Sequence, residues 1–241
     1  MKTIFITFAA SILIPLSYGA TVLTLNSNDL QVAGGTYNLT EGIGSGYGNI
    51  SITMALDSQA FQSAILSGNV KGNIFTANDN KLIGLGLNYV STGTPSAGIY
   101  GSWSGGDYNR PITPINETTV NLSTGLKDLF SDNTYTSIAV TYQITSTGTW
   151  TYLTLVDSEG VATTLSGQDS ALKGSGFGAL TSFTYGTDYV KHLVVDNSAL
   201  NYNDSVTANL AAIAAASVPE PTTASLGLAG LALLMMRRKR A

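Results

Sequence analysis

One Gly-rich stretch of this 241-residue chain, GIYGSWSGGDYNRP, gathers side chains suited to ligand binding. It contains Tyr100, Trp103, Asp107, Tyr108 and Asn109. The face of an indole or phenol ring packs against the apolar C–H face of a pyranose, while Asp and Asn side chains bind hydroxyl groups. These residues are therefore candidates for a carbohydrate-binding loop. The alternative is that Tyr100 and Trp103 are core aromatics of an ordinary strand.

Groups that could perform acid–base or nucleophilic catalysis are few. A retaining glycosidase needs two carboxylates about 5 Å apart, and the glutamates of the body lie far from one another in the sequence. They are Glu41, Glu117 and Glu159. Asp188 and Asp196 could form a pair, although their spacing carries no specific signal. The single histidine, His192, is expected to lie in a strand and to face the same side as Val190 and Val194. We therefore expect a protein that is not an enzyme.

Metal ligands are also scarce. The chain has no cysteine, which excludes zinc sites built on thiolates, and a single histidine contributes little to an imidazole cluster. Oxygen ligands for Ca²⁺ could come from Asn78, Asp79 and Asn80 or from Asp107 and Asn109, without the regular spacing of an EF-hand loop. The same residue types are common in turns because they tolerate left-handed backbone conformations. We expect no cofactor, and calcium is the open alternative.

The length and charge of the body, residues 21–216, limit its organisation and its partners. Its length suits one domain with one core. The body contains six basic and fourteen acidic residues, which gives a net charge of −8. Since an acidic surface repels phosphate backbones and the basic residues are scattered, nucleic acid is not an expected partner.

Apolar residues that alternate with polar ones predict strands throughout the body. In ISITMAL, residues 50–56, every second residue is apolar and shares one face, and KLIGLGLNYV, residues 81–90, repeats the pattern. Residues 134–165 predict a three-stranded antiparallel meander whose turns are TSTG and DSEG. YVKHLVVD, residues 189–196, predicts one more strand.

A single segment before the C-terminal tail predicts a helix. Asp204 or Ser205 would cap this helix, and Val206, Leu210 and Ile213 would form its buried face at positions i, i+4 and i+7. Many short strands, turns rich in Gly, Asn and Ser, and one helix favour an all-β fold. We expect an antiparallel β-sandwich of the jelly-roll form.

Parts of the body resemble laminin-G-like, concanavalin A-like domains. IAVTY, residues 138–142, matches the strand that this family writes as hVAVTYD, and LVDSEG, residues 155–160, is similar to its YVDG segment. The stretch YVKHLVVDNSALNYNDSVTANLAAIA, residues 189–214, resembles the closing strand and short helix of the family. The resemblance implies a jelly-roll fold for residues 21–216 and no particular activity.

Residues 1–20 have the order of a secretory signal peptide. Lys2 precedes an apolar run from Ile4 to Leu16, and Gly19 and Ala20 are small residues after which cleavage is expected. This order predicts export of the body.

The C-terminal segment, residues 217–241, combines Pro219, Glu220 and Pro221 with a following apolar run and a basic end. The basic residues are Arg237, Arg238, Lys239 and Arg240. As a helix, the apolar run 224–236 would rise about 20 Å, less than the roughly 30 Å hydrocarbon core of a bilayer. The order is similar to the PEP-CTERM sorting signal of Gram-negative bacteria. That resemblance implies recognition by an exosortase-type enzyme, transient contact of the short apolar helix with the inner membrane, and delivery to the cell envelope or extracellular matrix.

Together these patterns predict an exported, exosortase-sorted protein of the cell surface or matrix. Its body is expected to be a non-catalytic module that binds carbohydrate, with an extracellular polysaccharide as partner. Two alternatives are a purely structural coat or adhesion protein without a small ligand, and an enzyme that acts on glycosides.

Overall fold

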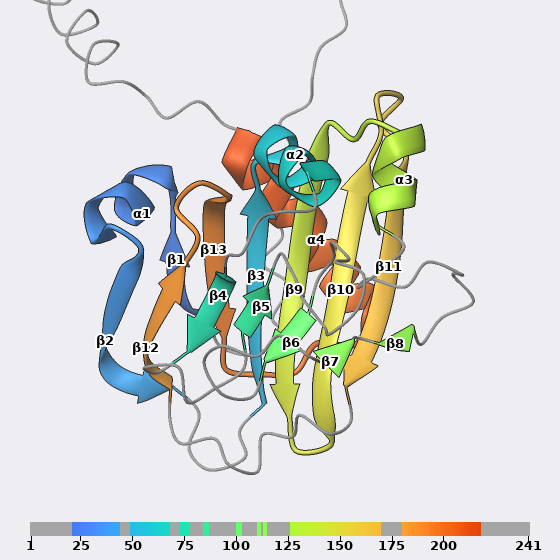
Figure 1. The fold of residues 1–241 in the computed structure, drawn as a ribbon. Coiled ribbons are helices and arrows are strands. Elements are labelled where there is room, and N and C mark those ends of the chain that lie inside the picture. Colours follow the sequence, from blue (N-terminus) through green and yellow to red (C-terminus); the bar gives the residue numbers. More distant parts are fainter. Residues whose placement is uncertain are drawn as a thin grey trace, which may run out of the picture.

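The protein is an all-β, antiparallel sandwich of two sheets. The computed structural model describes residues 21–43, 49–67, 73–77, 84–86, 100–102, 110–111, 113–114, 126–169 and 180–217. Every strand pair in these ranges is antiparallel. Figure 1 shows the two sheets face to face, with the six-stranded sheet in front of the seven-stranded sheet. The expected all-β, antiparallel sandwich is confirmed.

The seven-stranded sheet, called sheet A, contains the long central strands. Its order is β1-β13-β3-β9-β10-β11-β8. The bounds are β1 Thr21–Leu25, β13 Val190–Asp196, β3 Ile50–Leu56, β9 Ser137–Thr145, β10 Gly148–Val156, β11 Ala162–Asp169 and β8 Thr113–Pro114. Strands β9, β10 and β11 pair in sequence order, so the predicted meander is confirmed.

The six-stranded sheet, called sheet B, is built of shorter strands. Its order is β2-β12-β4-β5-β6-β7. The bounds are β2 Thr36–Ile43, β12 Leu180–Tyr185, β4 Asn73–Ala77, β5 Gly84–Gly86, β6 Tyr100–Ser102 and β7 Arg110–Pro111. Strand β5 falls inside the predicted strand 81–90, whose other residues lie outside the described ranges.

The space between the sheets is filled by one apolar cluster, as expected for a single core. From sheet A, Ile52 and Met54 are fully buried in it. From sheet B, Phe75 and Phe183 stack with ring centroids 5.1 Å apart. Because side chains alternate along a strand, the predicted face of β3 that begins at Ile50 is the inner face of the sheet.

The prediction that Val190 faces the same side of β13 as His192 and Val194 is wrong. Val190 pairs with Leu56 and His192 pairs with Ala55, so two residues of β13 oppose one of β3. This bulge reverses the alternation. Val190 therefore belongs to the core cluster, whereas His192 lies on the opposite side of the sheet.

Three short helices were not expected from the sequence. They are α1 Ser27–Ala33, α2 Ser58–Ser67 and α3 Leu126–Asp132. Helix α2 has the signals of a helix on a small scale, because Asp57 caps it and Phe61, Ala64 and Ile65 form its buried face. Its apolar pattern spans only ten residues, so it is hard to distinguish from the alternating pattern of the neighbouring strands.

Helix α4, Tyr202–Ser217, crosses the outer face of sheet A, behind that sheet in Figure 1. The sequence predicted the helix but not its cap or its buried face. The cap is Asn201, whose side-chain oxygen accepts the backbone N–H of Asp204 at 3.0 Å. The buried residues are Ser205, Asn209 and Ala212. Leu210, expected to be buried, is 40% exposed, because the surface beneath the helix is polar.

Candidate functional site

The hairpin formed by β6 and β7 frames the stretch selected from the sequence. Tyr100 pairs with Pro111 and Gly101 pairs with Arg110, so the two ends of the candidate loop lie side by side. Strand β7 ends the order of sheet B, and Figure 1 shows it next to β6 in the front layer. The backbone thus closes the stretch into one hairpin at an edge of the sandwich.

The predicted binding residues of this hairpin fall largely outside the described part of the chain. Trp103, Asp107, Tyr108 and Asn109 belong to residues 103–109, which lie outside it. Tyr100 is placed by its backbone in β6. The hairpin therefore supplies a frame for the predicted site, and the site residues stay a prediction.

The other terminal and loop predictions also lie outside the described ranges. They are the signal peptide, residues 1–20, the possible calcium ligands Asn78, Asp79 and Asn80, and the sorting segment from Pro219 through Arg237, Arg238, Lys239 and Arg240. Among the described residues, none of the helices has the length and apolarity needed to span a bilayer.

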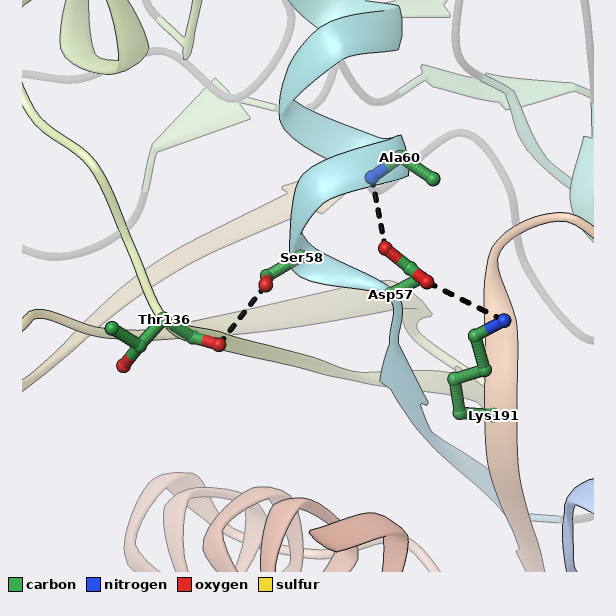
Figure 2. Close-up of polar contacts among 5 residues, drawn as sticks. All are labelled: Asp57, Ser58, Ala60, Thr136 and Lys191. Carbon is green, nitrogen blue, oxygen red and sulfur yellow. Dashed lines mark hydrogen bonds and ion pairs between the residues drawn. The ribbon is translucent and has the colours of Figure 1, made fainter.

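The carboxylate of Asp57, which is partly exposed, lies at the junction of β3 and α2 (Figure 2). One oxygen accepts the backbone N–H of Ala60 at 2.9 Å, which caps α2. The other lies 3.4 Å from Nζ of Lys191, and both side chains are partly exposed. An exposed ion pair of this kind contributes little to stability. Asp57 therefore has a structural role at the start of α2.

At the same junction, the hydroxyl of Ser58 also has a structural role. Ser58 donates from Oγ to the backbone oxygen of Thr136 at 3.0 Å (Figure 2). The amide of Gln62 accepts the N–H of Tyr135 at 2.9 Å and donates to its carbonyl at 2.8 Å. These bonds tie α2 to the segment before β9. They make the junction a structural joint between the helix and the sheet.

A second polar cluster lies between α4 and the outer face of sheet A, with Asn209 at its centre. Oδ1 of Asn209 accepts the hydroxyl of Thr141 at 2.8 Å. Nδ2 donates to the backbone oxygen of Tyr152 at 2.9 Å and to the hydroxyl of Thr154 at 3.0 Å. Asn209 is fully buried. Since a buried amide is costly without partners, these three bonds fix the position of α4 along the sheet.

Gln143 continues the cluster toward the N-terminus of α4. Its Nε2 donates to the backbone oxygen of Leu200 at 2.7 Å and to Oγ of Ser205 at 2.8 Å. Ser51 on β3 donates to the backbone oxygen of Ser198 at 2.5 Å. The segment that leads from β13 into α4 is therefore held to the sheet by side chains that the strand pattern alone marked only as polar.

Two remaining candidates for chemistry are separated or buried. Asp188 precedes β13 and Asp196 ends it, and the six steps of the strand from Val190 to Asp196 alone span about 20 Å at 3.3 Å per residue, which is too far for a glycosidase pair. His192 is 5% exposed, and burial lowers its pKa from the ordinary 6.5, so the ring is neutral at neutral pH. Its place in the sheet is confirmed.

Burial also raises the pKa of several tyrosines. For Tyr135 the cause is burial and then the negative charge of Asp157. Asp157 itself accepts the N–H groups of Glu159 and Val161, at 3.0 and 2.8 Å, in the turn between β10 and β11. Within the described ranges, acidic and histidine side chains form no group of three or more that could hold a metal ion.

Comparison with known proteins gives structural neighbours and no family. No family model matches the chain, and no curated protein matches it. Among solved structures, it is similar to a GH54 α-L-arabinofuranosidase soaked with a cyclic sulfate inhibitor, with 10% identity and a TM-score of 0.44. A second is an arabinofuranosidase complexed with arabinofuranosyl-alpha-1,2-xylobiose, with 13% identity and a TM-score of 0.40. The matches cover 75% of this chain but only 38% and 39% of those chains.

Proposed function

We propose that the protein is an exported, non-catalytic component of the cell surface or extracellular matrix that binds polysaccharide through the β6–β7 hairpin. The observation that carries the proposal is the pairing of Gly101 with Arg110, which closes the aromatic and polar stretch between them into one loop. Binding residues commonly lie on loops that a rigid sheet positions. Tyr100, Trp103 and Tyr108 then supply ring faces, and Asp107 and Asn109 supply hydrogen bonds to hydroxyl groups.

The structural roles of three of the described carboxylates support a role without catalysis. Asp57 caps α2 and pairs with Lys191. Asp157 closes the turn after β10, and Asp29 accepts the N–H of Asn26 at the start of α1. General acid–base catalysis needs positioned groups with a free role in proton transfer. These three carboxylates have structural roles instead.

The export part of the proposal rests on sequence order. Residues 1–20 have the order of a signal peptide, and Pro219, Glu220 and Pro221 begin the segment similar to the PEP-CTERM signal. Helix α4 ends at Ser217, so this motif follows the folded body almost directly. An exosortase-type enzyme is the proposed processing partner.

Affinity electrophoresis tests the binding function. The full-length protein is run through native gels with and without laminarin, hydroxyethylcellulose or galactomannan, beside Trp103→Ala and the control Gln59→Ala on the exposed side of α2. Retardation that Trp103→Ala reduces, and Gln59→Ala does not, supports the hairpin site. Equal retardation of Trp103→Ala and the parent would remove Trp103 from the site. No retardation on any glycan would favour a structural coat protein.

Two further measurements address the remaining parts of the proposal. Release of reducing sugar from these polysaccharides would support an enzyme instead. Intact mass of the protein recovered from an exosortase-containing host tests sorting. A mass that lacks residues 1–20 and the basic end is expected, and a mature form that keeps Arg237 to Arg240 would contradict C-terminal processing.

A further inference from the structure

We propose a second carbohydrate-binding surface on the outer face of sheet A, beside the N-terminus of α4. It consists of Trp150 and Tyr152 on β10, Ser166 and Gln168 on β11, and Tyr202 at the start of α4, here called the Trp150 platform. The strand pattern of the sequence does not bring these five residues together. Strands β6 and β7 of the proposed function belong to the other sheet.

The register of β10 and β11 places four of the five side chains in a square. Trp150 lies opposite Gln168, and Tyr152 lies opposite Ser166. Directly opposed residues point to the same side of a sheet, with Cβ atoms about 5 Å apart, and the next residue on that side is about 7 Å along the strand. The square is therefore about as large as one pyranose ring.

This square is on the outer face of the sheet, where Trp150 and Gln168 are partly exposed and Tyr152 and Ser166 are buried. Thr151 and Leu153, which alternate with Trp150 and Tyr152, are buried, and Leu153 belongs to the core cluster. Tyr152 also lies opposite Thr141, whose hydroxyl bonds to α4 across the outer face. Trp150 remains partly exposed.

Helix α4 adds a third aromatic ring at the border of the square. Tyr202 packs edge-on against Tyr152, with ring centroids 5.9 Å apart and planes at 69°. Tyr202 is 42% exposed, whereas Tyr152 is 5% exposed. The bonds from Gln143 to Leu200 and Ser205 hold the start of α4, and with it Tyr202, in place. The exposed phenol is therefore preorganised by the polar cluster under the helix.

Polar groups of the platform have hydrogen-bonding capacity to spare. Ser166 is 1% exposed, and its hydroxyl has no hydrogen-bond partner among the described residues. In the same part of the structure, no hydrogen bond engages the indole N–H of Trp150 or the amide of partly exposed Gln168. Buried polar groups are nearly always paired. The hydroxyl of Ser166 is itself buried, so the groups that a sugar, with its C–H face and hydroxyl groups, would contact are the ring of Trp150 and the amide of Gln168.

The chemistry of the five side chains defines the class of ligand. None of them carries a charge at neutral pH, so the platform offers no cation to a uronate or sulfate group. Aromatic faces and amides suit a neutral pyranose within a polysaccharide. With the hairpin on the other sheet, such a platform would let one molecule hold two glycan chains.

Tryptophan fluorescence tests the platform, because the chain has only two tryptophans, Trp103 and Trp150. In full-length Trp103→Phe, emission reports on Trp150 alone. Titration with laminarin, hydroxyethylcellulose and galactomannan is expected to give a saturable change in emission with at least one of them. Gln168→Ala and Tyr202→Ala in this background are expected to weaken the apparent affinity roughly 2- to 10-fold. Leu210→Ala, an exposed change on the same helix, is the matched control and should leave it unchanged.

The outcomes separate this inference from the proposed function. Emission of Trp150 that does not respond to any of the three glycans, in a variant that unfolds at the temperature of the parent, would overturn the platform. A response that Gln168→Ala and Tyr202→Ala both leave unchanged would overturn it as well. The reciprocal variant Trp150→Phe reports on Trp103, so its response tests the hairpin alone. Either surface can fail while the other binds.

Discussion

The two faces of sheet A are built of different chemistry although the same strands form both. On the inner face, Met54 and Val140 are neighbours on adjacent strands and pack into the apolar core. On the outer face, Thr53 and Thr141 occupy the adjoining row, and their hydroxyl oxygens lie 2.9 Å apart. Sheet B covers the first face and helix α4 covers the second.

The difference shows how each face specifies what covers it. Apolar contact is favourable in many orientations, so the inner face drives the sandwich together without fixing every detail. Hydrogen bonds are directional, and a misplaced helix would leave Asn209 and its partners buried without bonds. The outer face therefore sets the position of α4, and with it the position of Tyr202 in the Trp150 platform.

Met54→Ala should have the largest effect on stability, because it leaves a cavity in the inner face. Met54 is fully buried between the sheets. Loss of its side chain is expected to lower the free energy of unfolding by about 2–5 kcal/mol. Urea denaturation of the variant and the parent measures this difference. A loss below the cost of an exposed substitution would mean that the inner face is loosely packed.

Asn209→Ala should cost about 2–3 kcal/mol, because the hydroxyl of Thr141 and the carbonyl of Tyr152 lose their partner. Its control is Leu210→Ala, one residue further along α4 and 40% exposed, which should change stability by less than about 0.5 kcal/mol. Urea denaturation of both variants measures the two losses of stability. A larger loss for Leu210→Ala than for Asn209→Ala would contradict a polar contact face.

His192 makes the outer face sensitive to pH. Its pKa is lowered by burial in the folded protein, so below pH 6.5 the unfolded chain binds a proton that the folded protein does not. The contribution of neutral His192 to stability is fully present above pH 6.5. It is lost as the pH drops below that value, by at most about 1.4 kcal/mol per pH unit.

Melting temperatures between pH 7.5 and 5 measure this dependence. His192→Gln should flatten the curve in that range, since the chain has no other histidine. An equally steep curve in the variant would assign the pH dependence to other groups.

Apart from the control Leu210→Ala, Thr53→Val should have the smallest effect, about 1 kcal/mol, because it removes one hydroxyl from a network that keeps its bond between Thr141 and Asn209. Thr141→Val breaks both links and is expected to cost more. Thermal unfolding of the two variants gives the order. Equal stability of both variants and the parent would show that these hydroxyl groups contribute shape and not hydrogen bonding.

The parts of the fold that could be predicted are those whose signal is local. Alternation over residues 134–165 predicted β9, β10 and β11, and the turn signals between them fixed their pairing. The bulge between Val190 and His192 has no such local signal, because it arises from pairing with β3. Helix α2 is short, and its cap Asp57 became recognisable only beside the buried Phe61.

The two candidate sites also differ in whether the sequence alone could predict them. Residues 100–109 form one stretch of sequence, so their types alone made them candidates. Trp150, Gln168 and Tyr202 come from three separate elements, and their proximity follows from strand register and from the docking of α4. Asn201 and Asn209 carried no visible signal, since Asn is common throughout this chain and its role depends on what it faces.

The sequence by itself determined the class of fold, the single core, the meander and the expectation of export, because alternation, composition and terminal segments are properties of the chain. Only the tertiary structure decided which face of α4 is buried, where β13 shifts its register, and which residues of β10, β11 and α4 meet. The physical reason is that the alternation of apolar residues indicates which side chains are buried, whereas hydrogen-bond partners and strand register depend on residues far away in the sequence.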